Sequence, residues 1–224
     1  MNIQGFGDRR RWNKKAAPDR VEVMRERVLA VARGIVAQGD LSALTCESLV
    51  RSLRMRPTSL FKLFGGLDQV RDALTVRALE ELTELVRSAI GGCAGREALQ
   101  AYLEVQRLYA QAHPGMYEAA MRRLTELSPA AEQALEAYAD VELAALRAYG
   151  LAIGDVAALS WCLRACVRGA IGLEASDRLT KPHDIDQNLD RLISLVDASA
   201  RLAAPAVEHR PPSNVRMARQ LGRV

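Results

Sequence analysis

The stretch from residue 54 to residue 62, "RMRPTSLFK", concentrates groups that bind anions or exchange hydrogen bonds. Guanidinium and ammonium groups pair with phosphate oxygens, and hydroxyls bond to phosphates and to base edges. Because proline costs no hydrogen bond at the first position of a helix, the pattern predicts a short helix that begins at Pro57. The stretch contains three cations, two hydroxyls and one proline but no carboxylate: Arg54, Arg56, Pro57, Thr58, Ser59 and Lys62.

Apolar residues at helical spacing predict the elements that must position this stretch. The helix that starts at Pro57 should place Leu60, Phe61 and Phe64 on its inward side. Thr45 is of a type that caps helix N-termini, and glycines end the first and third helices. The predicted N-terminal elements are a helix from Arg20 to the residue before Gly39, a short helix capped by Thr45, a third over Pro57–Phe64 and a long one over 67–90.

The rest of the chain predicts further long helices separated by glycine and proline, and no alternating run predicts a strand. We therefore expect an all-α fold of about nine helices. An N-terminal three-helix bundle containing a helix-turn-helix would precede a larger helical domain. The expected units are a flexible basic arm over 1–19, a helix-turn-helix domain over 20–66, a helical domain over 67–203 and a basic tail over 204–224.

The charge of the chain is concentrated at its start. Residues 1–62 hold 13 Lys and Arg against 6 Asp and Glu, whereas the other 162 residues hold 18 against 21. Such a basic head favours either a polyanionic partner or simply a solvated basic surface. No run of about 18 uncharged apolar residues predicts a membrane span. Four cysteines at irregular spacing do not form a secreted disulfide framework, so we expect a cytoplasmic protein that contacts no membrane.

Two short helices joined by a tight turn, the second of them basic, match a helix-turn-helix DNA reader, in which the second helix enters the major groove. A helical hairpin in the core, with its arginines merely solvated, is the alternative. The basic N-terminal arm favours the reader, because such arms reach an adjacent groove or phosphates. The candidate DNA-binding residues are Arg9, Arg10, Arg11, Lys14, Lys15, Thr45, Arg54, Arg56, Pro57, Thr58, Ser59, Phe61 and Lys62.

Several stretches resemble the TetR family of bacterial transcriptional regulators. "QGDLSALTCESLVRSL", "RMR", "SLFKLF" and "GGL" are similar to its DNA-binding domain. "AYLEVQRLYAQAHPGMYEAAMRR" and "LSWCLRACVRGAIGLEASDRL", followed by "DIDQNLDRLISLV", are similar to the helical regulatory domain of one subgroup. That subgroup shows a Trp and a His-Gly where this chain has Trp161 and Arg168-Gly169.

The chain departs from the family pattern at five positions near the recognition helix. Arg54 and Arg56 stand where the family has a turn glycine and a capping serine. Phe61, Leu63 and Leu67 stand where it has tyrosine, histidine and lysine, which commonly contact phosphates. We therefore expect a redistributed phosphate grip in which the added arginines, Lys62 and the arm compensate.

The resemblance implies that residues 67–203 form a ligand-binding and dimerisation domain. Apolar stripes on the last two helices would form a four-helix bundle with a second copy, or else bury only against their own chain. The candidate dimer residues are Leu159, Leu163, Cys166, Val167, Ala170, Leu189, Leu192, Ile193 and Val196. The candidate ligand-binding residues, which suit an apolar pocket with a few polar groups, are Tyr102, Tyr109, Met116, Tyr117, Met121, Tyr138 and Trp161.

The sequence thus favours a DNA-binding transcriptional regulator, a ligand-responsive repressor that binds a pseudo-palindromic operator as a homodimer. Its expected partners are double-stranded DNA, a second copy and a small apolar or amphipathic effector, with no cofactor. An all-α enzyme is disfavoured, because no nucleophile with a base, carboxylate pair or metal-ligand spacing is found. A regulator-derived helical interaction or small-molecule-binding protein with weakened or lost DNA binding is the remaining alternative.

Overall fold

The computed structural model describes residues 20–176 and 182–204, and these ranges contain helices and connections but no strand. The all-α prediction is therefore confirmed. The predicted arm residues, Arg9, Arg10, Arg11, Lys14 and Lys15, lie outside the described residues, as does the tail from 205 onward. The described elements are α1 (Arg20–Ala37), η1 (Leu41–Ala43), α2 (Cys46–Leu53), α3 (Pro57–Phe64), α4 (Leu67–Ile90), α5 (Arg96–Ala112), α6 (Pro114–Met121), α7 (Pro129–Leu146), η2 (Arg147–Tyr149), α8 (Ile153–Ala175) and α9 (Pro182–Ala203).

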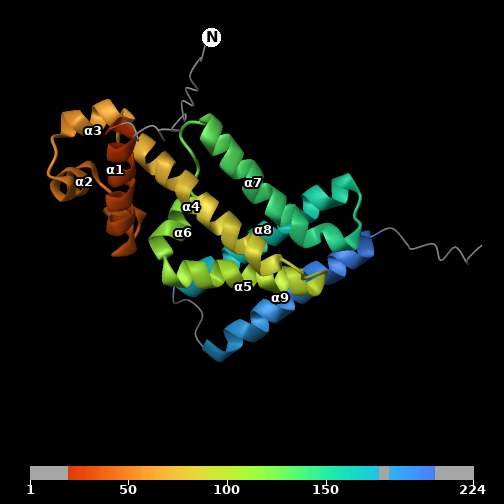
Figure 1. The fold of residues 1–224 in the computed structure, drawn as a ribbon. Helices are drawn as coiled ribbons and strands as arrows, with labels where there is room; N and C mark the ends of the chain where they lie inside the picture. Colours follow the sequence, from red (N-terminus) through yellow and green to blue (C-terminus); the bar gives the residue numbers. More distant parts are fainter. Residues whose placement is uncertain (1–19, 177–181, 205–224) are drawn as a thin grey trace, which may run out of the picture.

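The first three helices form a small bundle at one end of the molecule (Figure 1). One face of each helix is fully or almost fully buried, and α3 contributes Leu60 at 0% exposure. Helix α2 begins at a capping box, in which the Ser48 N–H donates to the Thr45 hydroxyl (3.0 Å) and the Thr45 N–H donates to the Ser48 hydroxyl (2.9 Å). The predicted cap at Thr45 is therefore confirmed, and the start of α2 is fixed by it.

Helix α4 connects this bundle to the remaining helices and runs away from it toward the far end of the molecule (Figure 1). It contacts α1 and α3 near its start and α5, α6 and α7 along its length. Eleven of its residues are buried, so its surface is covered on several sides. A displacement of α4 therefore cannot occur without a change in the bundle or in the helices that surround it.

Helix α6 packs directly on the backbone at the end of α1. A Cβ atom placed on Gly115 would lie 2.3 Å from the carbonyl oxygen of Val36 and 2.9 Å from its Cβ. No side-chain rotation relieves contact with a backbone oxygen, so only glycine fits between these two helices. Gly115 is the position at which the regulatory helices touch the end of α1 most closely.

Helices α8 and α9 pack against each other and against α5, and α8 also contacts α7. The structure corrects most of the predicted dimer interface, because six of those side chains face their own chain's core. Cys166, Ala170 and Leu192 are half-buried. The six buried ones, none more than 9% exposed, are Leu159, Leu163, Val167, Leu189, Ile193 and Val196.

Among the described helices, α8 is the one whose length and composition would suffice to cross a membrane, a feature the search for an uncharged apolar run missed. It carries Arg164 and Glu174, which form ion pairs with Glu142 of α7 and Arg107 of α5. Its opposite side leaves Trp161 and Leu173 exposed. Helix α8 is therefore one wall of the domain with an uncovered apolar outer face.

Candidate DNA interface and the regulatory helices

The turn between α2 and α3 is built around a left-handed residue. Arg54 has φ 51° and ψ 42°, a conformation that glycine adopts readily and other residues adopt at a cost. Its N–H donates to the carbonyl of Arg51, and the Met55 N–H donates to that of Val50 (3.1 Å). The turn thus keeps the geometry that glycine usually supplies, and it gains a guanidinium at that position.

The outer face of α3 is open to solvent. Arg54, Arg56, Pro57, Thr58, Phe61 and Lys62 are exposed, and Ser59 is half-buried. Arg51 pairs with Glu47, whereas the side chains of Arg54, Arg56 and Lys62 have no hydrogen-bond or ion-pair partner among the described residues. These three cations are consequently available to an external anion, and they flank the hydroxyls at the start of the helix.

The far end of α3 is held by a single arginine from α1. Arg25 donates from Nε and Nη2 to the carbonyl oxygen of Leu63, at 3.1 and 2.8 Å, and its guanidinium lies 5.3 Å from the centre of the Phe64 ring. A carbonyl at a helix C-terminus lacks an intrahelical partner, and Arg25 supplies one. This contact fixes how far α3 projects from the bundle.

Three side chains near α3 cannot donate hydrogen bonds to phosphate. Phe61 is 54% exposed, which corrects its predicted inward orientation and places it on the same open surface as Lys62. Leu63 and Leu67 are half-buried and pack against the core. An exposed aromatic ring among cations offers apolar contact to a base or sugar in place of the phosphate contact that a hydroxyl would make.

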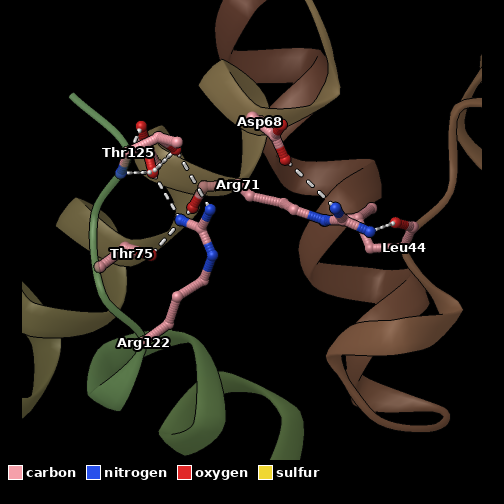
Figure 2. Close-up of polar contacts among 7 residues, drawn as sticks. Leu44, Asp68, Arg71, Thr75, Arg122 and Thr125 are labelled. Carbon is pink, nitrogen blue, oxygen red and sulfur yellow. Dashed lines mark hydrogen bonds and ion pairs between the residues drawn. The ribbon is translucent and has the colours of Figure 1, made fainter.

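Two consecutive residues of α4 connect the helix-turn-helix with the segment that follows α6 (Figure 2). Arg71 donates to the carbonyl oxygen of Leu44, just before α2, at 2.9 Å. Asp72 accepts from the Arg122 guanidinium at the end of α6 and from the N–H and hydroxyl of Thr125, both at 3.1 Å. The patterns in the sequence did not indicate this link, because its partners lie 27 to 53 residues apart.

Burial alone would raise the pKa of Asp72, but the hydrogen bonds from Arg122 and Thr125 outweigh it and hold the pKa below its usual value. A carboxyl whose folded pKa is depressed stabilises the fold above its unfolded pKa, near 3.8, and loses that contribution as the pH falls through the lower folded pKa. Asp72 therefore stabilises this link at neutral pH and not in strong acid.

We expect the substitution Asp72→Asn to lower the free energy of unfolding by about 1–3 kcal/mol at pH 7, because it removes charge from a partly buried hydrogen-bonded site. Below about pH 3 the variant and the wild type should converge. Urea denaturation at pH 7 and pH 3 measures both values, with the exposed Asp155→Asn as control. A deficit that is equal at the two pH values would contradict the role of charge.

The predicted ligand-binding residues divide between core and surface. Five of them are no more than 9% exposed: Tyr102, Tyr109, Met116, Tyr117 and Tyr138. Met121 is half-buried and, with Tyr117, lines a cavity of about 570 Å³. Trp161 is 68% exposed on α8, so it does not line an internal pocket, and its assignment is corrected.

A polar network crosses the core of the larger domain. The Tyr102 hydroxyl donates to Glu142 (2.7 Å), and the Tyr138 hydroxyl donates to the Gln106 side-chain oxygen (2.8 Å). Glu142 is 0% exposed and is paired with Arg164 of α8, whose Nε lies 3.0 Å from one carboxylate oxygen. Burial raises the pKa of both phenols, so they act as neutral donors. The network joins α5, α7 and α8.

An exposed basic helix on a three-helix bundle, attached through α4 to a wholly helical second domain, defines a helix-turn-helix protein. The family described as tetracyclin repressor-like, C-terminal domain, matches residues 99–196. The uncharacterised HTH-type transcriptional regulator YobS of Bacillus subtilis is 25% identical over 105 residues, which are 47% of this chain. The chain spans about half of that relative's length, 55%.

Solved structures show the same fold. BioQ of Mycobacterium smegmatis is 19% identical with a TM-score of 0.60, over 80% of this chain and 98% of that one. Apo ActR of Streptomyces coelicolor is 21% identical with a TM-score of 0.60, over 80% and 97%. ActR is also solved in complex with actinorhodin. With the family match and the helix-turn-helix, these findings place the chain in the TetR family of transcriptional regulators.

Proposed function

We propose that the protein is a ligand-responsive transcriptional repressor that binds a pseudo-palindromic DNA operator as a homodimer. The observation that carries the proposal is the open face of α3, where Arg54, Arg56 and Lys62 lack partners among the described residues and Thr58 is exposed. Three unpaired cations around a short helix are costly to keep close together unless an anion binds them. Double-stranded DNA is the anion that fits a helix presented end-on in this way.

The arrangement gives each group a separate task in DNA binding. Thr58 and Ser59, in the first turn of α3, lie where a recognition helix contacts base edges. Arg54, Arg56 and Lys62 flank that turn and would hold phosphates, in place of the contacts that Leu63 and Leu67 cannot make. The phosphate grip thus lies mainly before and along α3.

A second copy would cover the exposed apolar surface of α8 and α9. Trp161, Leu173, Leu195 and Leu202 are each at least 50% exposed there. A Cβ added to Gly169 or Gly172 would meet nothing, so this part of α8 leaves room for a close helix. Exposed apolar residues gathered on two adjacent helices are typical of a protein interface. Pairing through this surface would set the spacing of the two α3 helices, which must be about 34–36 Å for adjacent major grooves.

An effector would act by favouring one of two dimer arrangements. The complex of ActR with actinorhodin, in a protein of the same fold, supports a small-molecule effector. In this chain α4, α6 and the Arg71–Asp72 link connect the larger domain to the bundle. A ligand that prefers the arrangement with misplaced α3 helices lowers DNA affinity by the extent of that preference.

Selection of bound duplexes from a random library tests the proposal. We expect enrichment of a pseudo-palindrome whose half-sites lie about one helical turn apart, and we expect Thr58→Ala to change the preferred bases. Enrichment of no sequence would contradict the proposal. It would support instead a regulator-derived protein with lost DNA binding, a reading that the apolar residues Phe61, Leu63 and Leu67 favour.

A further inference from the structure

The cavity lined by Tyr117 and Met121 lies where the larger domain meets the end of the bundle. Its walls come from α5, α6 and α8, and from Asp40 and Leu41 at the connection between α1 and α2. Its volume of about 570 Å³ falls within the range typical of small-molecule sites. Met121, Ile171 and other apolar groups supply most of the wall. The cavity can therefore accept an apolar body.

The charged groups that line the cavity are unequally satisfied. Asp40 accepts hydrogen bonds from the Ser42 hydroxyl and N–H, and Glu118 accepts one from the Leu41 N–H (2.9 Å). Arg122 is paired with Asp72. Arg168, which is exposed, has no hydrogen-bond or ion-pair partner in the ranges that the structure describes. Among the described residues, the charge left over at the cavity is thus positive.

A buried donor without a partner lies beside that charge. The Tyr117 hydroxyl is buried and makes no hydrogen bond within the described part of the chain, and the residue is only 9% exposed. Burial raises the pKa of Tyr117 to about 12 against the opposing influence of Arg168, so the phenol keeps its proton at neutral pH. A buried polar atom without a partner is uncommon in proteins, and a bound ligand is one way to satisfy it.

We infer that this cavity is an effector site for an amphipathic anion, with an apolar body against Met121 and Ile171 and an acidic group on Arg168 and the Tyr117 hydroxyl. A carboxylate or sulfonate satisfies both the unpaired guanidinium and the unpaired donor. A neutral ligand would satisfy only one of them. The word effector rests on the proposed function, whereas the binding site itself rests on the cavity and these two groups.

The site is positioned to influence the helix-turn-helix. Tyr117 and Met121 lie on α6, the helix whose Glu118 accepts from the Leu41 N–H and whose Gly115 touches the backbone of Val36. An apolar body wedged between α6 and α8 would press on the same helix that contacts the end of α1. Occupancy would therefore shift the bundle relative to the larger domain.

Two fluorescent probes with the same aromatic body test the site. 1-Anilinonaphthalene-8-sulfonate carries an anionic group, and N-phenyl-1-naphthylamine is its uncharged counterpart. In titrations of the full chain, we expect Arg168→Gln to weaken binding of the sulfonate at least tenfold and Tyr117→Phe to weaken it several-fold. The uncharged probe should bind the wild type and Arg168→Gln alike.

Arg191→Gln is the matched control, because Arg191 is another exposed arginine without a described partner, on α9. Equal sulfonate affinity in Arg168→Gln and Arg191→Gln would overturn the inference, as would equal weakening of both probes by Arg168→Gln. Thermal unfolding of each variant should match the wild type, since Arg168 is exposed and Tyr117→Phe removes an unpaired hydroxyl.

The DNA experiment separates this inference from the proposed function. With a selected duplex, the sulfonate should lower the DNA affinity of the wild type and not that of Arg168→Gln. Sulfonate binding through Arg168 that leaves DNA affinity unchanged would refute an effector role. A wild type that binds no DNA would refute the proposed function, while the fluorescence titrations would still decide whether the anion site exists.

Discussion

The substitution Arg164→Leu should lower the free energy of unfolding at pH 7 by about 3–5 kcal/mol, the range found when one partner of a buried ion pair is removed. Glu142 is 0% exposed, and its carboxylate is held by Arg164 and the Tyr102 hydroxyl. Without the guanidinium, one hydroxyl must compensate a buried negative charge, which it cannot do fully. Urea denaturation followed by circular dichroism measures the loss.

A matched ion pair on the surface provides the control. Arg201 pairs with Asp197 one turn earlier on α9, and the Arg201 side chain is 66% exposed. Arg201→Leu should therefore cost less than about 1 kcal/mol. The double substitution Arg164→Leu, Glu142→Gln should recover part of the loss, because it removes the uncompensated charge. Equal stabilities of Arg164→Leu and Arg201→Leu would show that the buried pair does not hold α7 to α8.

The substitution Gly115→Ala should both destabilise the protein and weaken DNA binding. The added methyl group would lie 2.3 Å from the carbonyl oxygen of Val36, so α6 and α1 must separate. Overpacking of this kind costs about 1–3 kcal/mol. Because α1 carries Arg25, which holds the end of α3, the displacement should also misplace the recognition helix. Denaturation and fluorescence anisotropy with labelled duplex measure the two effects.

Gly34→Ala is the corresponding control on α1. A Cβ at Gly34 would meet nothing within 4 Å, and alanine favours a helix over glycine by about 1 kcal/mol. This variant should be slightly more stable than the wild type and should bind DNA equally well. If Gly115→Ala behaved as Gly34→Ala does, α6 would not press on α1, and the proposed route from the larger domain to the bundle would lack its first step.

Local signals in the sequence were enough to predict the recognition segment. A proline can start a helix but not continue one, and Thr45 followed by Ser48 caps one, so the predicted α2 start and the bounds of α3 are confirmed. The inward face of α3 was only partly predicted. Leu60 is buried but Phe61 is exposed, because an eight-residue helix contacts its bundle along too narrow a strip to cover both.

Helical periodicity identified the buried stripes of α8 and α9 but not what covers them. Leu163 and Ile193 recur at the spacing of an interface, yet they face their own chain. The side chains free to meet a second copy, such as Trp161 and Leu195, belong to the opposite faces. Periodicity shows that one face is apolar, and only the tertiary fold decides whether the other face of an apolar helix is covered as well.

Contacts between distant segments were beyond any local pattern. The need for glycine at 115 comes from Val36, and the role of Asp72 comes from Arg122 and Thr125. Each of these residues looks ordinary beside its neighbours in the sequence. Their importance arises only when α4 and α6 are packed against the bundle.

The salt dependence of duplex binding tests the central claim, that α3 displays cations and hydroxyls to a DNA groove. Fluorescence anisotropy between about 50 and 200 mM salt should show affinity falling steeply, by several factors of ten if six or more phosphates are bound. The substitution Lys62→Ala should weaken binding to all duplexes and reduce the slope of log affinity against log salt by about one, because Lys62 would neutralise one phosphate. No detectable binding at 50 mM salt, or a slope unchanged by Lys62→Ala, would contradict the account.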